Sequence, residues 1–453
     1  MTLDKVTPEQ LPSLPWELAD ARNPSQLWKC KVRVLLTEPV EGEKKGRAEF
    51  NYSLLPYPRV ECSVQLDEKA PPLLVDYIAH HIVIDHSGEE IPVFPLKIRQ
   101  GTDQCTQIDY VVDGSAVLGN RKAKKAVFQL VNFVNCSCDT DLICHNGNAG
   151  RRIGHLKLVA DEWEVDVTAR REIESSIEDA KLCGYAVTHI GEISRLDGKA
   201  FEPQQLQEFL ETVQSFLSFA RGAWCSAHLP MGETADGDTA FWLWYRQVVD
   251  KWHHKRNWFP EMQAQTLRQL FPEFVRLWHS DLWHKPLKEV IYWYLLANSL
   301  STVDAAVVLA QNALELLSWT YLVREQECVD EHTFKDVRTS QNIRYLMWAL
   351  DIPLEIPQGA EHFNKAFKSN KERDLPWALT DVRNWIVHPD NTTIENPKGL
   401  PYIASQAALW CIELALLRIM GYEGDYVNRL TAEWVGETEP VPWMKPGEKK
   451  DSS

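Results

Sequence analysis

The sequence predicts a multidomain α+β protein, in which an antiparallel β-rich N-terminal domain precedes an all-α helical domain. The chain has 453 residues, enough for about three domains of roughly 150 residues each. Before residue 195, apolar and polar residues alternate in many short segments, as half-buried strands require. From about Glu202 the apolar residues recur at the helical period instead. This change of period divides the chain into a β-rich part and a helical part.

Short strands dominate the first part, after a polar, Pro-containing N-terminal tail of residues 1–27. Alternation is clearest in Trp28–Leu36, Val60–Leu66 and Trp163–Val167. Further strands are expected at 80–85, 91–98, 105–112, 126–135, 155–160 and 184–194. Short strands separated by turn residues favour an antiparallel sandwich or barrel, which we expect to occupy residues 28–200.

Helices dominate the second part. Residues 201–299 are expected to form a helical, Trp-rich connecting region, and residues 300–425 a helical bundle, followed by a C-terminal tail at 426–453. The helices of the bundle are expected at 303–326, 341–350, 360–370, 376–388 and 403–421. The last of these is apolar on nearly every side, which is typical of the central helix of a bundle.

Composition and charge restrict the classes of function. The 48 Lys and Arg against 64 Asp and Glu give a net charge of -16, which argues against a protein that coats nucleic acid non-specifically. No secretory signal is expected at the N-terminus, and the longest apolar stretches are interrupted by polar residues such as Asp304 and Glu413. The ten Cys are read as reduced thiols. We therefore expect a cytoplasmic protein without a membrane partner.

The segment DLPWALTDVRNWIVHPD, residues 374–390, is the most informative in the chain. On a helical wheel, Arg383, Asn384, His388 and Asp381 share one face. The opposite face is apolar and contains Ala378, Leu379, Val382, Trp385 and Ile386. Pro389 disfavours helical geometry at the preceding residue, so the helix is expected to end at His388. A guanidinium, an amide and an imidazole at one helix end could hold a phosphate and move a proton. The alternative is a solvated polar face with a His near a helix C-terminus.

Arg383-Asn384-Trp385-Ile386-Val387-His388 resembles the RNxxxH motif of the HEPN ribonucleases. The setting is also similar to that family, because the motif ends one helix of an all-α region and lies between two longer helices. The resemblance implies a metal-independent endoribonuclease that acts as a homodimer and needs no cofactor. His388 would transfer protons, Arg383 would bind the scissile phosphate, and Asn384 would orient one of them. Glu315 and Asp381 are the candidate supporting acids, although each could simply lie on a solvated face.

The β-rich first half resembles the N-terminal domains that precede HEPN domains in some bacterial defence proteins. This implies a bacterial defence or toxin effector, in which the N-terminal domain senses a trigger or regulates the nuclease. The alternative is a non-catalytic HEPN-like module that binds a protein or a nucleotide.

Other polar groups could bind RNA or a metal. Lys365, Lys368, Lys371 and Arg373 precede the motif and could guide an RNA backbone. Cys136, Cys138, Cys144 and His145 are a weak zinc candidate, because a CxC pair lacks the usual knuckle spacing. The run Lys251–Trp258 mixes cations with aromatic residues and could stack on RNA, or form a solvated turn anchored by its Trp residues.

Overall fold

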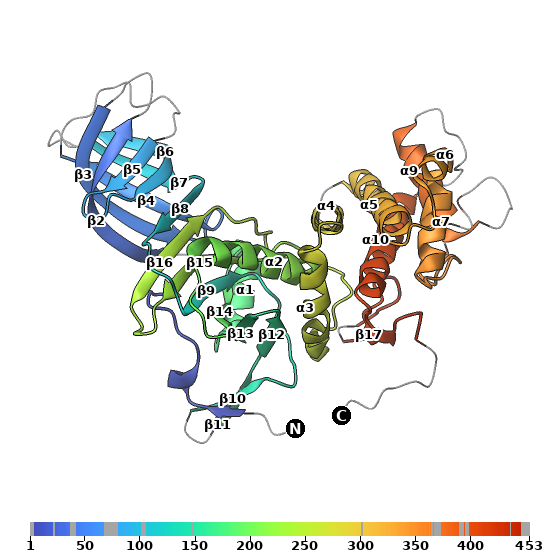
Figure 1. The fold of residues 1–453 in the computed structure, drawn as a ribbon, viewed down its shortest axis with the longest axis horizontal. Coiled ribbons are helices and arrows are strands. Elements are labelled where there is room, and N and C mark those ends of the chain that lie inside the picture. Colours follow the sequence, from blue (N-terminus) through green and yellow to red (C-terminus); the bar gives the residue numbers. More distant parts are fainter. Residues whose placement is uncertain are drawn as a thin grey trace. The chain divides into compact units, whose positions relative to one another are not determined.

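The described residues form two compact units, and each is described by itself. Unit 1 comprises Met1–Asn135, Asp139–Gln214 and Cys225–His253, and unit 2 comprises Cys136–Cys138, Ser215–Trp224 and His254–Ser453. The ribbon in Figure 1 gives the labels of the helices and strands used below. The computed structural model describes residues 4–20, 23–36, 42–67, 80–100, 106–146, 149–299, 302–361, 363, 366, 373–388, 394, 398–434 and 436–444.

Six strands of unit 1 close into a barrel in which every pairing is antiparallel (Figure 1). In barrel order they are β2 (Ser25–Leu36), β3 (Gly42–Ser53), β4 (Arg59–Leu66), β7 (Thr106–Val112), β6 (Glu90–Gln100) and β5 (His80–Ile84). Val60, Cys62, Val64 and Leu66 of β4 all point into the core, which confirms the predicted alternation. Because the barrel is closed, none of these strands is left as an unpaired edge.

A seven-stranded antiparallel sheet makes up the rest of the β structure of unit 1, together with a small sheet. The order in the large sheet is β12 (His155–Ala160), β13 (Trp163–Ala169), β14 (Val187–Arg195), β9 (Lys125–Val131), β15 (Ser226–Glu233), β16 (Thr239–Tyr245) and β8 (Ser115–Leu118). The small sheet contains β1 (Asp4–Val6), β10 (Leu142–Asn146) and β11 (Ala149–Ile153), and its β1–β10 pairing is parallel. Helix α1 (Ile173–Cys183) packs against β14.

Helix α2 (Pro203–Arg221) begins in unit 1 and ends in unit 2. In unit 1, Phe209 stacks on Trp163 of β13 with the ring centroids 4.8 Å apart. In unit 2, Phe216 contacts Phe271 and Phe274 of α3 (Gln265–Trp278) at centroid distances of 5.2 and 5.0 Å. The predicted helix at about 202–222 is thus confirmed, and its apolar stripe is buried along its whole length.

Unit 2 is a helical bundle, as the sequence predicts. Helix α5 (Val303–Ser318) contacts α4 (His284–Asn298), α7 (Thr339–Ala349), α9 (Leu375–Val387) and α10 (Leu400–Ile419). It continues directly into η4 (Trp319–Glu325), which is π-helical. Short helices η3 (Glu261–Gln263) and α6 (Glu331–Asp336) complete this unit within the described residues, together with the strand pair β17 (Asp425–Tyr426) and β18 (Glu439–Pro440).

The domain boundaries expected from the sequence differ from the structure in three places. Residues 226–245 of the expected helical connecting region are the strands β15 and β16 of the large sheet. The expected N-terminal tail contains β1, the 3₁₀ turn η1 (Pro8–Gln10) and the start of β2. The expected C-terminal tail contains β17 and β18, and its Tyr426 and Arg429 are buried in unit 2. Contacts with distant residues order these segments despite their polar sequences.

Two helices have the length and composition of a membrane span, Val303–Glu325 and Leu400–Ile419. The most apolar window of the second helix is 78% buried within the fold, because α10 is the central helix that the sequence predicts. Length and composition alone therefore do not identify either helix as a membrane span.

Candidate functional site

The candidate site lies at the C-terminal end of α9, whose start is held firmly. Asp374 caps the helix by accepting a hydrogen bond from the backbone N–H of Trp377 at 3.1 Å. The Arg344 guanidinium of α7 donates to both oxygens of the same carboxylate, with Nη2 2.8 Å from Oδ1. A two-pronged charged hydrogen bond of this kind fixes direction as well as distance. It therefore ties the start of α9 to α7.

Arg383 and Asn384 lie in the last turns of α9, and both are half-buried. Nη1 of Arg383 donates to Oδ1 of Asn384 at 3.2 Å. Nε of Arg383 is buried and has no hydrogen-bond partner among the described residues. The guanidinium thus makes one hydrogen bond to a described residue, and a planar guanidinium is a group that can bind phosphate oxygens.

His388 is the C-cap of α9, and its side chain is exposed. Its backbone is extended, with φ -120° and ψ 101°, and its N–H donates to the Asn384 carbonyl at 2.9 Å. The expectation that Pro389 ends the helix at His388 is confirmed. In the part of the chain that the structure describes, the imidazole has no side-chain partner, so both ring nitrogens remain available for proton transfer.

The helical wheel correctly predicts the burial of only some residues on the apolar face of α9. Ala378, Leu379 and Val382 are buried. Trp385 and Ile386, which were expected behind the motif in the core, are only half-buried, and Val387 is exposed. The last turn of α9 therefore presents apolar surface next to the polar motif.

The two candidate supporting acids do not contact the motif. Asp381 pairs with Arg373 at 3.6 Å, and burial raises the pKa of this carboxyl while Arg373 partly opposes that rise. Glu315 accepts a hydrogen bond from Gln311 at 2.9 Å. Within the described residues neither acid forms an ion pair or hydrogen bond with Arg383 or His388. Supporting roles for Asp381 and Glu315 are therefore not borne out by direct contact.

Of the four cations expected to guide RNA, the structure describes Arg373. Lys365, Lys368 and Lys371 lie outside the described residues. Arg373 is largely buried, and its guanidinium lies 4.1 Å from the ring centroid of Trp377 besides pairing with Asp381. A cation held by a carboxylate and an aromatic ring is a structural group of the bundle. The RNA contact of Arg373 therefore stays a prediction, and the structure shows its guanidinium engaged within the bundle.

The weak zinc candidate of the Cys-rich segment is not assembled as a ligand cluster within the described residues. Cys136, Cys138 and Cys144 are buried. Among the described residues, no three His, Cys, Asp or Glu side chains, His145 included, come close enough to hold a metal ion. Buried Cys commonly behaves as a small apolar residue, which accounts for these three.

Sequence reasoning missed Arg344 as the residue that positions α9. Its partner Asp374 lies 30 residues further along the chain, so no local pattern marks the pair.

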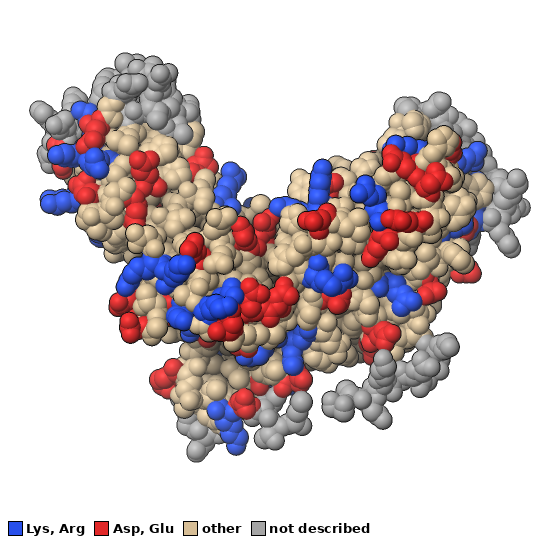
Figure 2. All heavy atoms as spheres, in the orientation of Figure 1, with Lys and Arg blue, Asp and Glu red and all other residues tan. Residues whose placement is uncertain are grey.

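Charge at the surface is mixed: on the face shown in Figure 2, Lys and Arg are interspersed with Asp and Glu. This agrees with the expectation that the protein is not a general nucleic-acid coat.

The chain is an α+β protein with a β-rich unit and a helical unit, and the helical unit contains the polar RNxxxH segment at the end of α9. Two family descriptions match it: the YopA central domain over residues 119–255 and the YopA C-terminal domain over residues 280–440. The SPbeta prophage-derived uncharacterized protein YopA of Bacillus subtilis (strain 168) is 31% identical over 339 residues, which cover 71% of this chain and 72% of that relative. The chain therefore belongs to the YopA family. No solved structure matches it. The motif falls within the C-terminal match.

Proposed function

We propose that the protein is a metal-independent endoribonuclease of the HEPN type, with Arg383, Asn384 and His388 as its catalytic residues. The observation that carries the proposal is the exposed His388 at the end of α9, five residues after the half-buried Arg383 on the same helix. An imidazole and a guanidinium are the two groups that phosphodiester cleavage by an internal nucleophile needs.

In this mechanism the 2′-OH of RNA attacks the adjacent phosphorus, and the 5′-oxygen of the next nucleotide leaves. His388 removes the proton from the 2′-OH or returns one to the leaving oxygen, because an imidazole can both accept and donate a proton. Arg383 neutralises the charge that builds on the phosphate oxygens. Asn384 holds the Arg383 side chain at one hydrogen bond. The products are a 2′,3′-cyclic phosphate and a 5′-OH.

A homodimer is part of the proposal. Each chain supplies a single His388, whereas the reaction needs a base and then an acid. Two motifs that meet across an interface would supply both groups. Half-buried Trp385 and Ile386 and exposed Val387 lie beside the motif, and such apolar surface is suited to a second subunit. The prophage origin in the printed name of the Bacillus relative is compatible with a defence or toxin effector that the β-rich unit regulates.

The test is cleavage of purified total bacterial RNA in buffer with EDTA. Wild-type protein should cleave, and His388→Ala should not, while both keep the same circular dichroism. His332→Ala is the matched control, because His332 is an exposed His on α6 of the same unit, and it should cleave like wild type. RNA that is bound but left intact by wild type would favour the alternative, a non-catalytic HEPN-like binding module. Cleavage by His388→Ala at the wild-type rate would show that the active site lies elsewhere in the protein.

A further inference from the structure

A cavity of about 310 Å³ in unit 2 is separate from the α9 motif. Its walls are two segments outside the main helices, residues 254–261 and 427–436. The first wall includes half of the cationic and aromatic run that the sequence singles out, and the catalytic proposal does not use it. The volume lies at the lower end of the roughly 300–1,000 Å³ typical of small-molecule sites.

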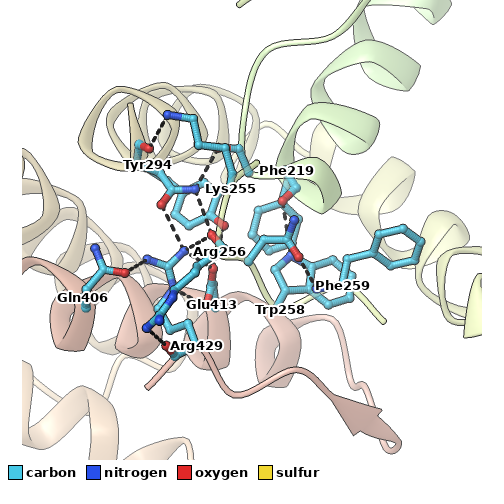
Figure 3. A network of polar contacts seen from close by, with 12 residues as sticks. Phe219, Lys255, Arg256, Trp258, Phe259, Tyr294, Gln406, Glu413 and Arg429 are labelled. Atoms are coloured by element: carbon cyan, nitrogen blue, oxygen red, sulfur yellow. Dashed lines mark hydrogen bonds and ion pairs between the residues drawn. The ribbon is translucent and has the colours of Figure 1, made fainter. Parts of the chain in front are cut away.

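A buried polar network holds both walls in place (Figure 3). Arg429 is fully buried and donates to Glu413 of α10 through Nη2 at 2.9 Å and Nε at 3.1 Å. Nη2 of Arg429 also donates to the Arg256 carbonyl at 2.6 Å, and the Arg256 Nη1 donates to the Arg429 carbonyl at 3.1 Å. Each wall thus holds the other, so the cavity is formed before any ligand arrives.

One cation at the cavity, Arg256, has no carboxylate partner among the described residues. Arg256 is exposed, and its guanidinium makes one hydrogen bond, to the Arg429 carbonyl, with no ion pair to a described residue. His254 also lines the cavity, is exposed, and has no side-chain partner among the described residues. Unused guanidinium donors in a planar fork match the oxygens of a phosphate.

The aromatic surface of the cavity comes from an unexpected residue. Trp258 of the cationic run is fully buried, and its Nε1 donates to the Phe219 carbonyl at 3.2 Å, so it cannot stack on a ligand. Trp434 lines the cavity instead and is 65% exposed. Gly436 has φ +95°, and a Cβ there would lie 3.3 Å from the Trp434 ring. Glycine therefore allows the backbone turn that brings this ring against the chain.

Two carboxyl groups, Glu261 and Glu433, also line the cavity. Burial raises the pKa of Glu261 to about 7, and Arg221 only partly opposes that rise. Near neutral pH this carboxyl is thus protonated in about half of the molecules, which weakens its repulsion of an anion. A protonated carboxyl can also donate a hydrogen bond to a polar ring atom.

We infer that this cavity binds a single ribonucleotide, with its phosphate on Arg256 and His254 and its base stacked on Trp434. The nucleotide is either a free nucleoside monophosphate or one residue of a single-stranded RNA, since both present the same phosphate and base. This site is independent of Arg383 and His388, so it stands whether or not the protein cleaves RNA.

The test is isothermal titration of the full-length His388→Ala protein with each of the four ribonucleoside 5′-monophosphates, and separately with a tetraribonucleotide. Trp434→Ala and Arg256→Gln should each weaken binding about tenfold or more. Trp348→Ala and Arg338→Gln are the matched controls, because Trp348 is 74% exposed and Arg338 is exposed elsewhere in the unit. Both controls should bind like the parent protein.

Binding of monophosphates identifies the ligand as a free nucleotide, and binding of the tetramer alone identifies it as a residue of RNA. No binding of either probe, or equal losses in the two control variants, would overturn the inference. Because Arg256→Gln removes a hydrogen bond to the Arg429 carbonyl, circular dichroism is recorded for each variant. His254→Ala provides a second cationic variant that removes no described side-chain contact and should also weaken binding.

Discussion

Arg383 and Asn384 are successive residues of α9, and their side chains are joined by a hydrogen bond of 3.2 Å from Nη1 to Oδ1. This bond uses Nη1 of the guanidinium, and Nε is buried without a described partner. The contact fixes the direction in which the guanidinium presents its other terminal nitrogen, Nη2. If a scissile phosphate binds at this position, the planar shape of the guanidinium matters as well as its charge.

The first prediction is that Arg383→Lys loses RNA cleavage by about a hundredfold or more, because an ammonium group cannot reproduce two parallel contacts to a phosphate. The melting temperature should stay close to that of wild type, since the side chain makes one hydrogen bond within the fold. Initial cleavage rates and a thermal melt measure the two effects. Arg338→Lys serves as the control at an exposed position. Cleavage by Arg383→Lys within about threefold of wild type would contradict a two-pronged contact.

The second prediction concerns assembly. If two motifs form one site, the cleavage rate per chain should fall as the protein is diluted below its dimerisation constant. Sedimentation should show that the loss of activity follows the loss of dimer. A rate per chain that is constant over the whole dilution series, in a protein that sediments as a 52.1 kDa monomer, would rule out the composite site.

The third prediction concerns the buried Arg429–Glu413 ion pair. Arg429→Met leaves the Glu413 carboxylate buried without its cation and should cost about 3–5 kcal/mol of unfolding free energy. Adding Glu413→Leu should recover most of that loss, because the unpaired charge is then removed. Arg418→Met is the control: Arg418 pairs with the exposed Asp351 at 2.7 Å, and its loss should cost about 1 kcal/mol or less. Urea unfolding measures all three. A double variant no more stable than Arg429→Met would refute this account.

The fourth prediction follows from Glu261. Its carboxyl has a folded pKa of about 7 against a reference value of 4.5, so the folded state retains the proton that the unfolded state loses. The unfolding free energy of wild type relative to Glu261→Gln should therefore fall as the pH rises from about 4.5 to 7, and be constant outside that window. The total change should be roughly 3–3.5 kcal/mol. Glu433→Gln is the control, because that carboxylate is exposed in the same cavity. A flat difference across this window would contradict the raised pKa.

Local signals in the sequence predict the end of α9 and part of its buried face. Pro389 predicts the end of α9 at His388, and the helical wheel predicts burial of Ala378, Leu379 and Val382. The wheel fails at Trp385 and Ile386 because periodicity gives the direction of a side chain, and the coverage of that direction depends on neighbouring elements. Alternation of Gly46, Ala48, Phe50 and Tyr52 in β3 was also present in the sequence, and it could have predicted that strand.

Long-range contacts explain what the sequence does not predict. Seven successive residues of β15, Ser226–Gly232, are buried, because this strand lies inside the seven-stranded sheet, and burial on both faces removes the alternation. In the sequence, Arg429 lies in a polar segment that was expected to be a tail. In the fold it contacts Glu413 and the Asn298 side chain, which lie earlier in the chain. Trp434 likewise joins Arg256 at one cavity from a position far along the chain.

The most direct measurement of the central claim uses two matched RNA oligonucleotides in EDTA. One is all-ribose, and the other carries a single 2′-deoxyribose at the mapped cleavage position. The account predicts cleavage of the first to a 2′,3′-cyclic phosphate and a 5′-OH, identified by mass spectrometry, and resistance of the second at that position, because the attacking 2′-OH is absent. Cleavage of the deoxy substrate at the same bond, or loss of all activity in EDTA, would contradict a metal-independent mechanism at Arg383 and His388.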